Sequence, residues 1–526
     1  MKAPVARTEC GALSWPSPNP GLKAGVTLWR ASGAGKQALT RVLVAIILWS
    51  IPGFGQTVRY TVSMPQPKSH VYQVELTIDR PGTQDVELSL PAWNALYQIR
   101  DFSQYVQNLR ANVPFKRIDK DSWRFSVGTA EQLKITYGVF ANETSSFSSQ
   151  LDESHGFFNG ADLFLFWTAR RELPIELTIA PPPDWKVATS LNPAGKPFTY
   201  LADNYDHLVD CPVDAGKLDM YSFVVDGVPF QISVDGSQRN YDRTELLTKV
   251  EQIVRTTVEF MGDIPFKHYY FIYHFNSDRD GGGMEHRDST AIHTSLNSRS
   301  IRSVLGVTSH EFFHLWNVKR IRPQGLEPVD YSRENYTTAL WFSEGVTSYY
   351  GDLFLRRGGL LTRQEYYDAI AQEIRTLQSR PGRKAISAAD ASLLTWYDKY
   401  PFFQQSDQSI SYYNKGLLIG LLLDFKIRDA TDNKHSFDTV LRYLNENFAK
   451  KNRFFEDDYG IARAITEATG VTLDKEYTSF VHTTDELPYS EVLRIAGLEW
   501  NGDRVREISN PTARQRRILE SWLSGK

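Results

Sequence analysis

The stretch HEFFHLWNVKRIRP, from His310 to Pro323, decides how the rest of the sequence is interpreted. On a helix, residues four apart lie on one face, so His310 and His314 can direct two imidazole nitrogens at one point. Glu311 lies about 100° further round the helix, where it can reach a water without being a ligand. The pattern predicts part of a catalytic zinc site, which needs three protein ligands and one open position. Two core histidines on a buried helix are the alternative.

A second helix is predicted to begin in WFSEGVTSYYGD, Trp341–Asp352, with Ser343 as its N-cap. This helix places Glu344 in its first turn, where a carboxylate completes a set of two histidines and one glutamate. Taken alone, Glu344 is explained as well by simple compensation of the helix dipole. Ser348 and Asp352 follow one and two turns later and are candidates for orienting the histidines.

Two more stretches carry polar groups that suit the same site. DGGGMEHRDST, Asp280–Thr290, places an acid after glycines that let a substrate backbone approach, and this acid can hold a free α-ammonium group. SYYNKGLLIGLLLDF, Ser411–Phe425, places Tyr413 at the head of an apolar helix, where its phenol can donate to an oxyanion. A surface turn and a core tyrosine are the alternatives. The predicted substrate-binding residues are Gly282, Gly283, Met284 and Glu285.

Together these four segments resemble the gluzincin metallopeptidases, whose motifs follow the order GxMEx, HExxH, a WxxEG-type helix and YxKG. The closer resemblance is to the glycyl aminopeptidase family, through HEFFHLWNVKRIRP, WFSEGVTSYYGDL and GGGMEHRDST. RDFSQYVQNLRA and LDESHGFFNG resemble the N-terminal β domain of that family, and ELPYSEVLRIAGLEW resembles its post-catalytic segment. The resemblance spans roughly residues 60–500. Relatives usually carry a PDZ domain after this point, and the 26 residues 501–526 are too few for one.

Apolar periodicity divides the chain in a way that agrees with this resemblance. Period-2 alternation from about Thr57 to Gly227, as in HVYQVELTID, predicts an antiparallel β domain. From Asp242 onward helical periodicity prevails behind a small sheet. This pattern predicts an α+β multidomain fold with an N-terminal β domain followed by a mostly helical domain, and the resemblance implies that the second is a thermolysin-like zinc metallopeptidase domain. The predicted bounds are a leader at 1–55, the β domain at 56–227, the catalytic domain at 228–485 and a C-terminal segment at 486–526.

The leader has the layout of a secretory signal. Val42–Ile51 is an apolar run that follows basic residues and precedes small ones near Gly55, where cleavage is expected. The protein is therefore predicted to be exported, periplasmic or extracellular, or membrane-tethered if the leader stays. A buried strand or core helix is the alternative, and a spanning helix would need about 20 apolar residues. Loss of Cys10 with the leader would leave Cys211 unpaired.

Composition adds limits on partners. The 526 residues are 41% hydrophobic and 13% aromatic, and the formal charge is −3, which gives no electrostatic support for binding nucleic acid. No stable membrane span is expected after removal of the leader. The sequence does not predict the oligomeric state.

These observations predict a zinc-dependent aminopeptidase with one Zn²⁺ per chain, held by His310, His314 and Glu344. Glu311 would serve as general base and Tyr413 would stabilise the oxyanion. Substrates would be peptides with a free N-terminus, and the resemblance implies glycine or alanine as the first residue. The rival hypotheses are a zinc endopeptidase and, in another class, a catalytically inactive exported binding protein. The sequence suggests no role for three residues of the signature, Asn317, Lys319 and Arg320.

Overall fold

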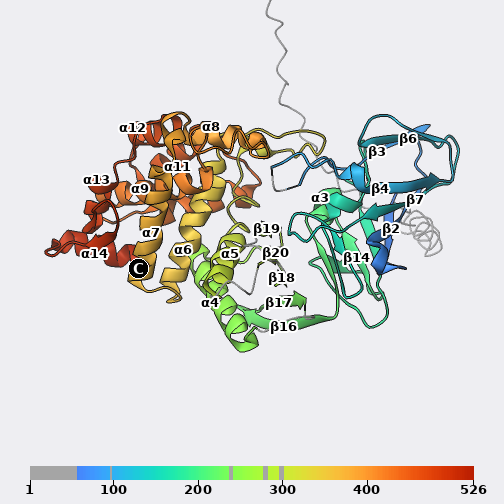
Figure 1. Ribbon diagram of the computed structural model, residues 1–526, viewed down its shortest axis with the longest axis horizontal. Helices are drawn as coiled ribbons and strands as arrows, with labels where there is room; N and C mark the ends of the chain where they lie inside the picture. Colours follow the sequence, from blue (N-terminus) through green and yellow to red (C-terminus); the bar gives the residue numbers. More distant parts are fainter. Residues whose placement is uncertain (1–55, 95–96, 236–240, 276–281, 295–300) are drawn as a thin grey trace, which may run out of the picture. The chain divides into compact units, whose positions relative to one another are not determined.

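The computed structural model describes residues 56–94, 97–235, 241–275, 282–294 and 301–526 (Figure 1). The predicted leader and Cys10 lie outside these residues. Gln56–Lys526 forms one unit of contacts, and Cys211 is buried and unpaired within it. The predicted fold class is confirmed, because β-sheets occupy the first part of this unit and helices most of the rest.

The β domain, defined here as strands β1–β15, follows from the period-2 pattern. In β2 (Val71–Asp79) the alternation buries Val74, Leu76 and Ile78 against the core of this domain. The other strands are β1 (Val58–Ser63), β3 (Asp85–Ser89), β4 (Val106–Ala111), β5 (Phe115–Arg117), β6 (Ser122–Ser126), β7 (Gln132–Phe140), β8 (Gln150–Leu151), β9 (His155–Phe158), β10 (Phe166–Trp167), β11 (Ile175–Ala180), β12 (Lys186–Ala188), β13 (Asn192–Pro193), β14 (Thr199–Ala202) and β15 (Val213–Gly216).

These strands form three sheets of order β13-β14-β11-β1-β2-β7-β4, β10-β3-β6-β5 and β12-β15-β9-β8. The pairing is antiparallel throughout them except for β1 with β11, which is parallel. Two short helices, α2 (Gly160–Leu163) and α3 (Tyr205–Val209), complete the described part of the domain.

A five-stranded mixed sheet of order β16-β17-β18-β20-β19 precedes most of the helices. Its strands are β16 (Leu218–Val225), β17 (Val228–Asp235), β18 (Tyr269–His274), β19 (Gly283–Glu285) and β20 (Ser289–His293). The predicted domain boundary after residue 227 falls in the turn between β16 and β17, which pair along their whole length. We therefore propose to place the boundary before β16.

Capping residues mark the ends of two predicted helices. Asp242 caps α4 (Arg243–Met261), which ends at Gly262 with φ 77°, and Thr362 and Glu365 form the predicted capping box of α7 (Arg363–Gln378). The remaining α-helices of the described residues after the five-stranded sheet are α5 (Ile301–Phe313), α6 (Thr347–Arg357), α8 (Ala388–Leu393), α9 (Tyr412–Ala430), α10 (Phe437–Asn447), α11 (Gly460–Thr469), α12 (Asp474–Tyr477), α13 (Tyr489–Leu493) and α14 (Ala513–Ser524).

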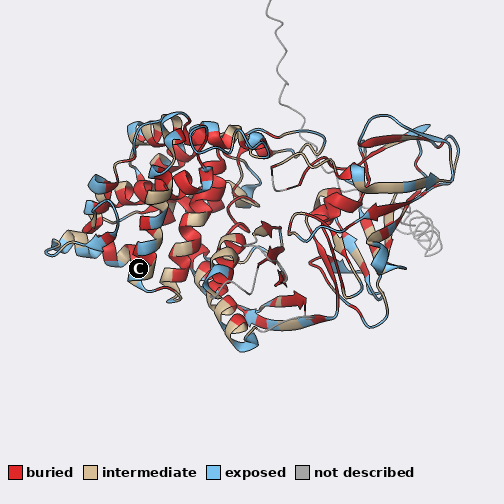
Figure 2. Cartoon of the chain, viewed as in Figure 1, coloured by how far each residue is buried: buried red, intermediate tan, exposed pale blue. Residues whose placement is uncertain are grey.

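Helix α9 lies at the centre of the helical part, and Figure 2 shows it almost entirely buried. Helix α14, in the predicted C-terminal segment, packs onto the same core through Trp522. The indole Nε1 of Trp522 donates to the Tyr349 hydroxyl at 2.8 Å, and Tyr349 donates to Asp424 of α9 at 2.7 Å. Among the described residues, no helix combines the length and apolar character that crossing a bilayer requires.

Candidate metal centre

The predicted ligands His310, His314 and Glu344 converge. The Nε2 atoms of the two histidines are 2.9 Å apart, and the Glu344 Oε2 atom is 3.5 Å from His310 Nε2 and 3.1 Å from His314 Nε2. Ligand atoms about 2.0–2.1 Å from one tetrahedral ion lie about 3.4 Å from each other. The donor types and their separations therefore fit Zn²⁺.

Hydrogen bonds to the other ring nitrogens orient both imidazoles. His314 Nδ1 lies 2.7 Å from the Asn317 carbonyl oxygen, and His310 Nδ1 lies 3.3 Å from Ser348 Oγ. With Nδ1 protonated and donating on His314, its Nε2 lone pair faces the common point, which is the arrangement of a ligating histidine. Ser348 thus has the predicted contact, whereas Asp352 lies close to Glu373 and Arg302 instead.

Glu344 lies in a π-helix, η5 (Trp341–Val346), that continues directly into α6. The predicted N-cap role of Ser343 is wrong, because the chain is already helical at Trp341 and Ser343 is fully buried inside the wide turn. Asn317 holds this turn in place. Its Nδ2 donates to the Phe342 carbonyl at 3.0 Å and to Thr347 Oγ1 at 3.1 Å, which gives this residue of the signature a physical role.

Two glycines bring the helix of Glu344 against the helix of Tyr413. A Cβ on Gly345 would lie 2.4 Å from the Gly416 Cα, and a Cβ on Gly416 would lie 2.2 Å from the Trp341 carbonyl oxygen. The backbones of η5 and α9 therefore approach as closely as only glycine allows. The Tyr413 ring lies 6.1 Å from the His310 ring and the residue is 40% exposed, so the predicted oxyanion donor borders the metal site and open space.

Glu311 lies beside the ligands as predicted, on the same side as the strand that carries Glu285. Ligand atoms of Glu285, Glu311 and His314 lie within 4.8 Å of one another. Glu311 Oε2 is buried and has no hydrogen-bond partner among the described residues. A Cβ on Gly283 would lie 2.3 Å from Glu311 Cγ, so the absence of a side chain at position 283 makes the space that Glu311 occupies.

The charges of the site are unbalanced. Burial raises the pKa of Glu311 well above its usual range; His314 opposes this rise, and Glu285 and Glu344 add to it. Burial lowers the pKa of His314, but Glu344 and the other two carboxylates outweigh burial and raise it to about 10. Three buried carboxylates around two imidazoles make a site whose negative charge a divalent cation would neutralise.

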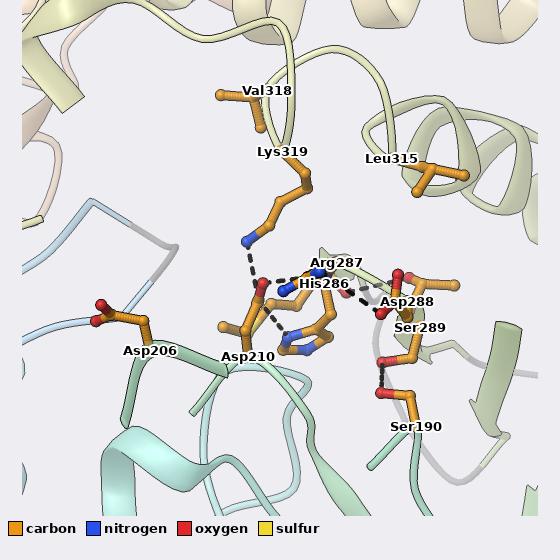
Figure 3. Close-up of polar contacts among 12 residues, drawn as sticks. Ser190, Asp206, Asp210, His286, Arg287, Asp288, Ser289, Leu315, Val318 and Lys319 are labelled. Atoms are coloured by element: carbon orange, nitrogen blue, oxygen red, sulfur yellow. Dashed lines mark hydrogen bonds and ion pairs between the residues drawn. The ribbon is translucent and has the colours of Figure 1, made fainter. Parts of the chain in front are cut away.

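A network that the sequence did not predict joins the β domain to this site (Figure 3). Asp210, the residue after α3, accepts hydrogen bonds from Lys319 Nζ at 2.8 Å and from the Arg287 backbone N–H at 3.1 Å, and His286 Nδ1 lies 3.3 Å away. Burial raises the pKa of Asp210, but Lys319 and His286 outweigh burial and hold it well below its usual range.

The network fixes the segment after Glu285 to the segment after the zinc helix. It also gives roles to two further residues of the signature, since Lys319 binds Asp210 and Arg320 forms an ion pair with Asp288 at 3.4 Å. Lys319 belongs to the signature that the sequence contains, but its partner Asp210 lies 109 positions away and no local pattern indicates that partner.

Comparisons with known proteins agree with this geometry. The Peptidase M61 N-terminal domain matches residues 59–217, and the M61 glycyl aminopeptidase matches residues 303–419. No curated protein sequence matches the chain. Among solved structures, an aminopeptidase N family protein from Idiomarina loihiensis is 30% identical with a TM-score of 0.78, and the match covers 84% of this chain and 78% of that one.

Two more distant structures show the fold alone. The M1 zinc metallopeptidase from Deinococcus radiodurans is 14% identical with a TM-score of 0.53, and the match covers 82% of this chain and 95% of that one. Yeast LTA4 hydrolase in complex with bestatin is 13% identical with a TM-score of 0.52, and the match covers 84% of this chain and 69% of that one. On the motifs, the two family matches and the identity to the Idiomarina protein, the chain belongs to the M61 glycyl aminopeptidase family and is a metallo-aminopeptidase.

Proposed function

We propose that this protein removes N-terminal residues from peptides and that one Zn²⁺ per chain, held by His310, His314 and Glu344, is needed for the reaction. The convergence of these three side chains at separations of 2.9–3.5 Å carries the proposal. When bound there, Zn²⁺ polarises the scissile carbonyl and lowers the pKa of water from 15.7 toward about 7.

The residues of the chain then divide the remaining work. Glu311 takes the proton of the attacking water on its free Oε2 and later delivers it to the leaving amine, a role that contributes about 10²–10⁴-fold to the rate. Tyr413 donates its hydroxyl to the oxygen on which negative charge develops. Because this charge is absent from the bound substrate, the hydrogen bond lowers the barrier rather than KM.

Glu285 makes the enzyme an exopeptidase in this proposal. Glu285 is 9% exposed at the end of β19, and its carboxylate accepts no hydrogen bond from another described residue, so it is available for the α-ammonium group of a substrate. An endopeptidase would not need this free acid. The family resemblance favours glycine or alanine as the first residue, and export of the protein stays a prediction from its leader.

The test is peptide hydrolysis by the purified protein, before and after treatment with a chelator and after addition of Zn²⁺. Free peptides are expected to lose their first residue, to stop doing so without metal, and to resume with zinc. N-acetylated copies of the same peptides are expected to stay intact. Equal cleavage of the acetylated peptides would favour the endopeptidase. No cleavage by zinc-loaded protein would favour the inactive binding protein.

A further inference from the structure

A cavity of about 290 Å³ lies within the β domain, and among the described residues it shares none of its lining with the metal centre. Its rim is exposed and includes Phe140, at the end of β7, and Glu143. Its floor is buried and includes Ser148 and Ser149, ahead of β8, and Asp162 of α2. The cavity therefore leads from the surface to a buried carboxyl group.

Asp162 has one carboxyl oxygen without a partner. Its Oδ2 accepts a hydrogen bond from Ser149 Oγ at 2.8 Å, whereas its Oδ1 is buried and has no hydrogen-bond partner among the described residues. A buried polar group without a partner costs free energy, so it needs an explanation in a folded protein. Because Asp162 lines the cavity, a ligand bound in the cavity could supply the missing partner.

No cation of the described residues pairs with Asp162. Arg100 acts on it electrostatically, but the Arg100 guanidinium donates to Glu143 at 2.8 Å and to Ser148 Oγ at 2.6 Å instead. Burial raises the pKa of Asp162 to about 8; Ser149 and Arg100 oppose this rise, and Glu143 adds to it. A cation bound beside Asp162 would stabilise its ionised form.

The rest of the lining is mostly apolar and suits a cation that carries a hydrocarbon chain. Phe102 and Tyr105 come from a single 3₁₀ turn, η2 (Phe102–Tyr105), and Val139 and Phe140 come from β7. Aromatic rings attract organic cations through their faces. A divalent metal ion would need several oxygen ligands where these side chains lie. The cavity is also larger than the about 150 Å³ that holds benzene, so a chain of about five carbons fits.

The single free oxygen of Asp162 distinguishes between two kinds of organic cation. A guanidinium group binds a carboxylate best through two parallel hydrogen bonds, which need both oxygens. Ser149 already occupies one of them. An ammonium group is a compact charge that needs only one oxygen, so it fits this carboxylate better.

Hydrogen bonds hold the floor of the cavity in place. Asn159, fully buried next to α2, donates its Nδ2 to the Ser146 carbonyl at 2.9 Å. Ser146 Oγ in turn donates to the Gly282 carbonyl at 3.0 Å and accepts from the His293 backbone N–H at 3.2 Å. The segment that carries Ser148 is therefore fixed to the sheet of the catalytic domain. A site that is formed beforehand costs a ligand little in ordering.

We propose that this cavity binds a primary ammonium group on an alkyl chain, with the ammonium at Asp162 and the chain along the apolar lining. A free alkylamine and the lysine side chain of a peptide present this same chemistry. The proposed site is separate from Glu285, which in the proposed function holds the α-ammonium group of the substrate.

The first experiment measures the binding of n-pentylamine and of 1-pentanol to the zinc-loaded protein by calorimetry at pH 8.5. At this pH Asp162 is mostly ionised, and the amine, with a pKa close to the about 10.4 of lysine, keeps its charge. Pentylamine is expected to bind at least tenfold more tightly than 1-pentanol, which has the same chain without the charge. Equal affinities, or no binding of pentylamine, would overturn the proposal.

The second experiment repeats the pentylamine titration with Asp162→Asn. Asparagine has the same shape and can still accept from Ser149, so we expect an unchanged thermal midpoint and an affinity at least tenfold lower. Asp184→Asn, at an exposed position of the same domain, is the matched control and should bind as the wild type does. Glu285→Gln should also keep the affinity. Full affinity in Asp162→Asn, or a loss confined to Glu285→Gln, would place the amine elsewhere and overturn the proposal.

A third titration identifies the source of the ammonium group. The probe is Nα-acetyl-lysine methylamide, whose only amine is that of the side chain. Binding at least as tight as that of pentylamine would identify the lysine side chain of a peptide as the ligand, and binding of pentylamine alone would identify a free amine. Binding of neither probe would overturn the proposal.

Discussion

Two single residues, Glu311 and Gly283, are each expected to control the candidate reaction. Glu311 has a carboxylate oxygen that is buried and without a hydrogen-bond partner among the described residues, which leaves it available to a proton. Gly283 makes room for this carboxylate, because a Cβ there would lie 2.3 Å from Glu311 Cγ. Glu311 is expected to act on the water directly, whereas Gly283 is expected to act only through Glu311.

Glu311→Gln is expected to retain zinc and to lose about 10²–10⁴-fold in kcat, because glutamine fills the same space but cannot take up a proton. Turnover and metal content of the same preparation check this. A variant with full zinc content and an unimpaired rate would remove Glu311 from the role of base.

Gly283→Ala is expected to displace the Glu311 carboxylate while the fold is kept, because the atoms it meets belong to the movable end of a side chain. We expect kcat to fall at least tenfold with little change in the thermal midpoint. Gly306→Ala, on α5, is the control and should keep its activity, because its Cβ would meet nothing within 4 Å apart from its chain neighbours and the backbone of its own helix. Equal activity of the two variants would contradict the steric argument.

Among the elements, η5 and α9 decide whether the third ligand and the oxyanion donor belong to one site. Their backbones meet at Gly345 and Gly416. Gly345 follows Glu344 directly, and Gly416 lies one turn after Tyr413. Any change that separates the two helices therefore moves a ligand away from the group that is proposed to stabilise charge opposite it.

Gly345→Ala is expected to destabilise the protein by about 1–3 kcal/mol, because a Cβ would lie 2.4 Å from the Gly416 Cα and backbone cannot move aside as a side chain can. The thermal midpoint and the affinity for zinc should both fall. Gly306→Ala serves again as the control, since alanine at an uncrowded helical position stabilises by up to about 1 kcal/mol. Full zinc affinity in Gly345→Ala would show that Glu344 does not depend on this contact.

The local parts of these elements could be predicted from the sequence. The spacing of His310 and His314 and the cap of α7 at Thr362 depend on residues within one turn, and the alternation in β2 depends on near neighbours. The contacts that complete the site could not be predicted from such local signals. Asp210 with Lys319 and Gly345 with Gly416 join residues 109 and 71 positions apart. The π-helix was missed because the signal of an N-cap serine at position 343 is local, whereas packing against α9 fixes where the helix starts.

For the molecule as a whole, a buried group of polar side chains joins a sheet of the β domain to the sheet of the catalytic domain. Asp214 Oδ1 lies 2.6 Å from His155 Nε2 and 3.1 Å from His274 Nε2, and Ser233 donates to its other oxygen. His274 Nδ1 lies 3.2 Å from His293 Nδ1. With each histidine neutral, every N–H finds an acceptor, and only the lone pairs of His155 Nδ1 and His293 Nε2 stay unpaired.

Acid is expected to weaken this junction. Burial lowers the pKa values of His274 and His293 in the folded protein. Below about pH 6.5 the unfolded chain therefore takes up protons on these two groups that the folded protein does not, and the free energy of unfolding decreases as the pH decreases. For His155, burial lowers the pKa but Asp214 outweighs it, so its pKa is raised and its contribution is present at low pH and lost as pH rises.

The expected net result is a lower thermal midpoint at pH 5 than at pH 7. His293→Asn is expected to reduce this difference, because it removes one titrating group. Each such group changes the free energy of unfolding by at most about 1.4 kcal/mol per pH unit. Lys68→Gln, an exposed substitution in the β domain, is the control. An undiminished acid shift in His293→Asn would exclude His293 as a contributor.

The contact between Asp210 and Lys319 has a consequence for how such proteins evolve. One partner lies in the segment matched by the N-terminal family domain and the other in the segment matched by the catalytic one. Gene recombination that joined the first segment of one relative to the second segment of another could leave a lysine without its acid near Glu285, the proposed partner of the peptide amine. Descendants should therefore inherit these two positions as a matched pair.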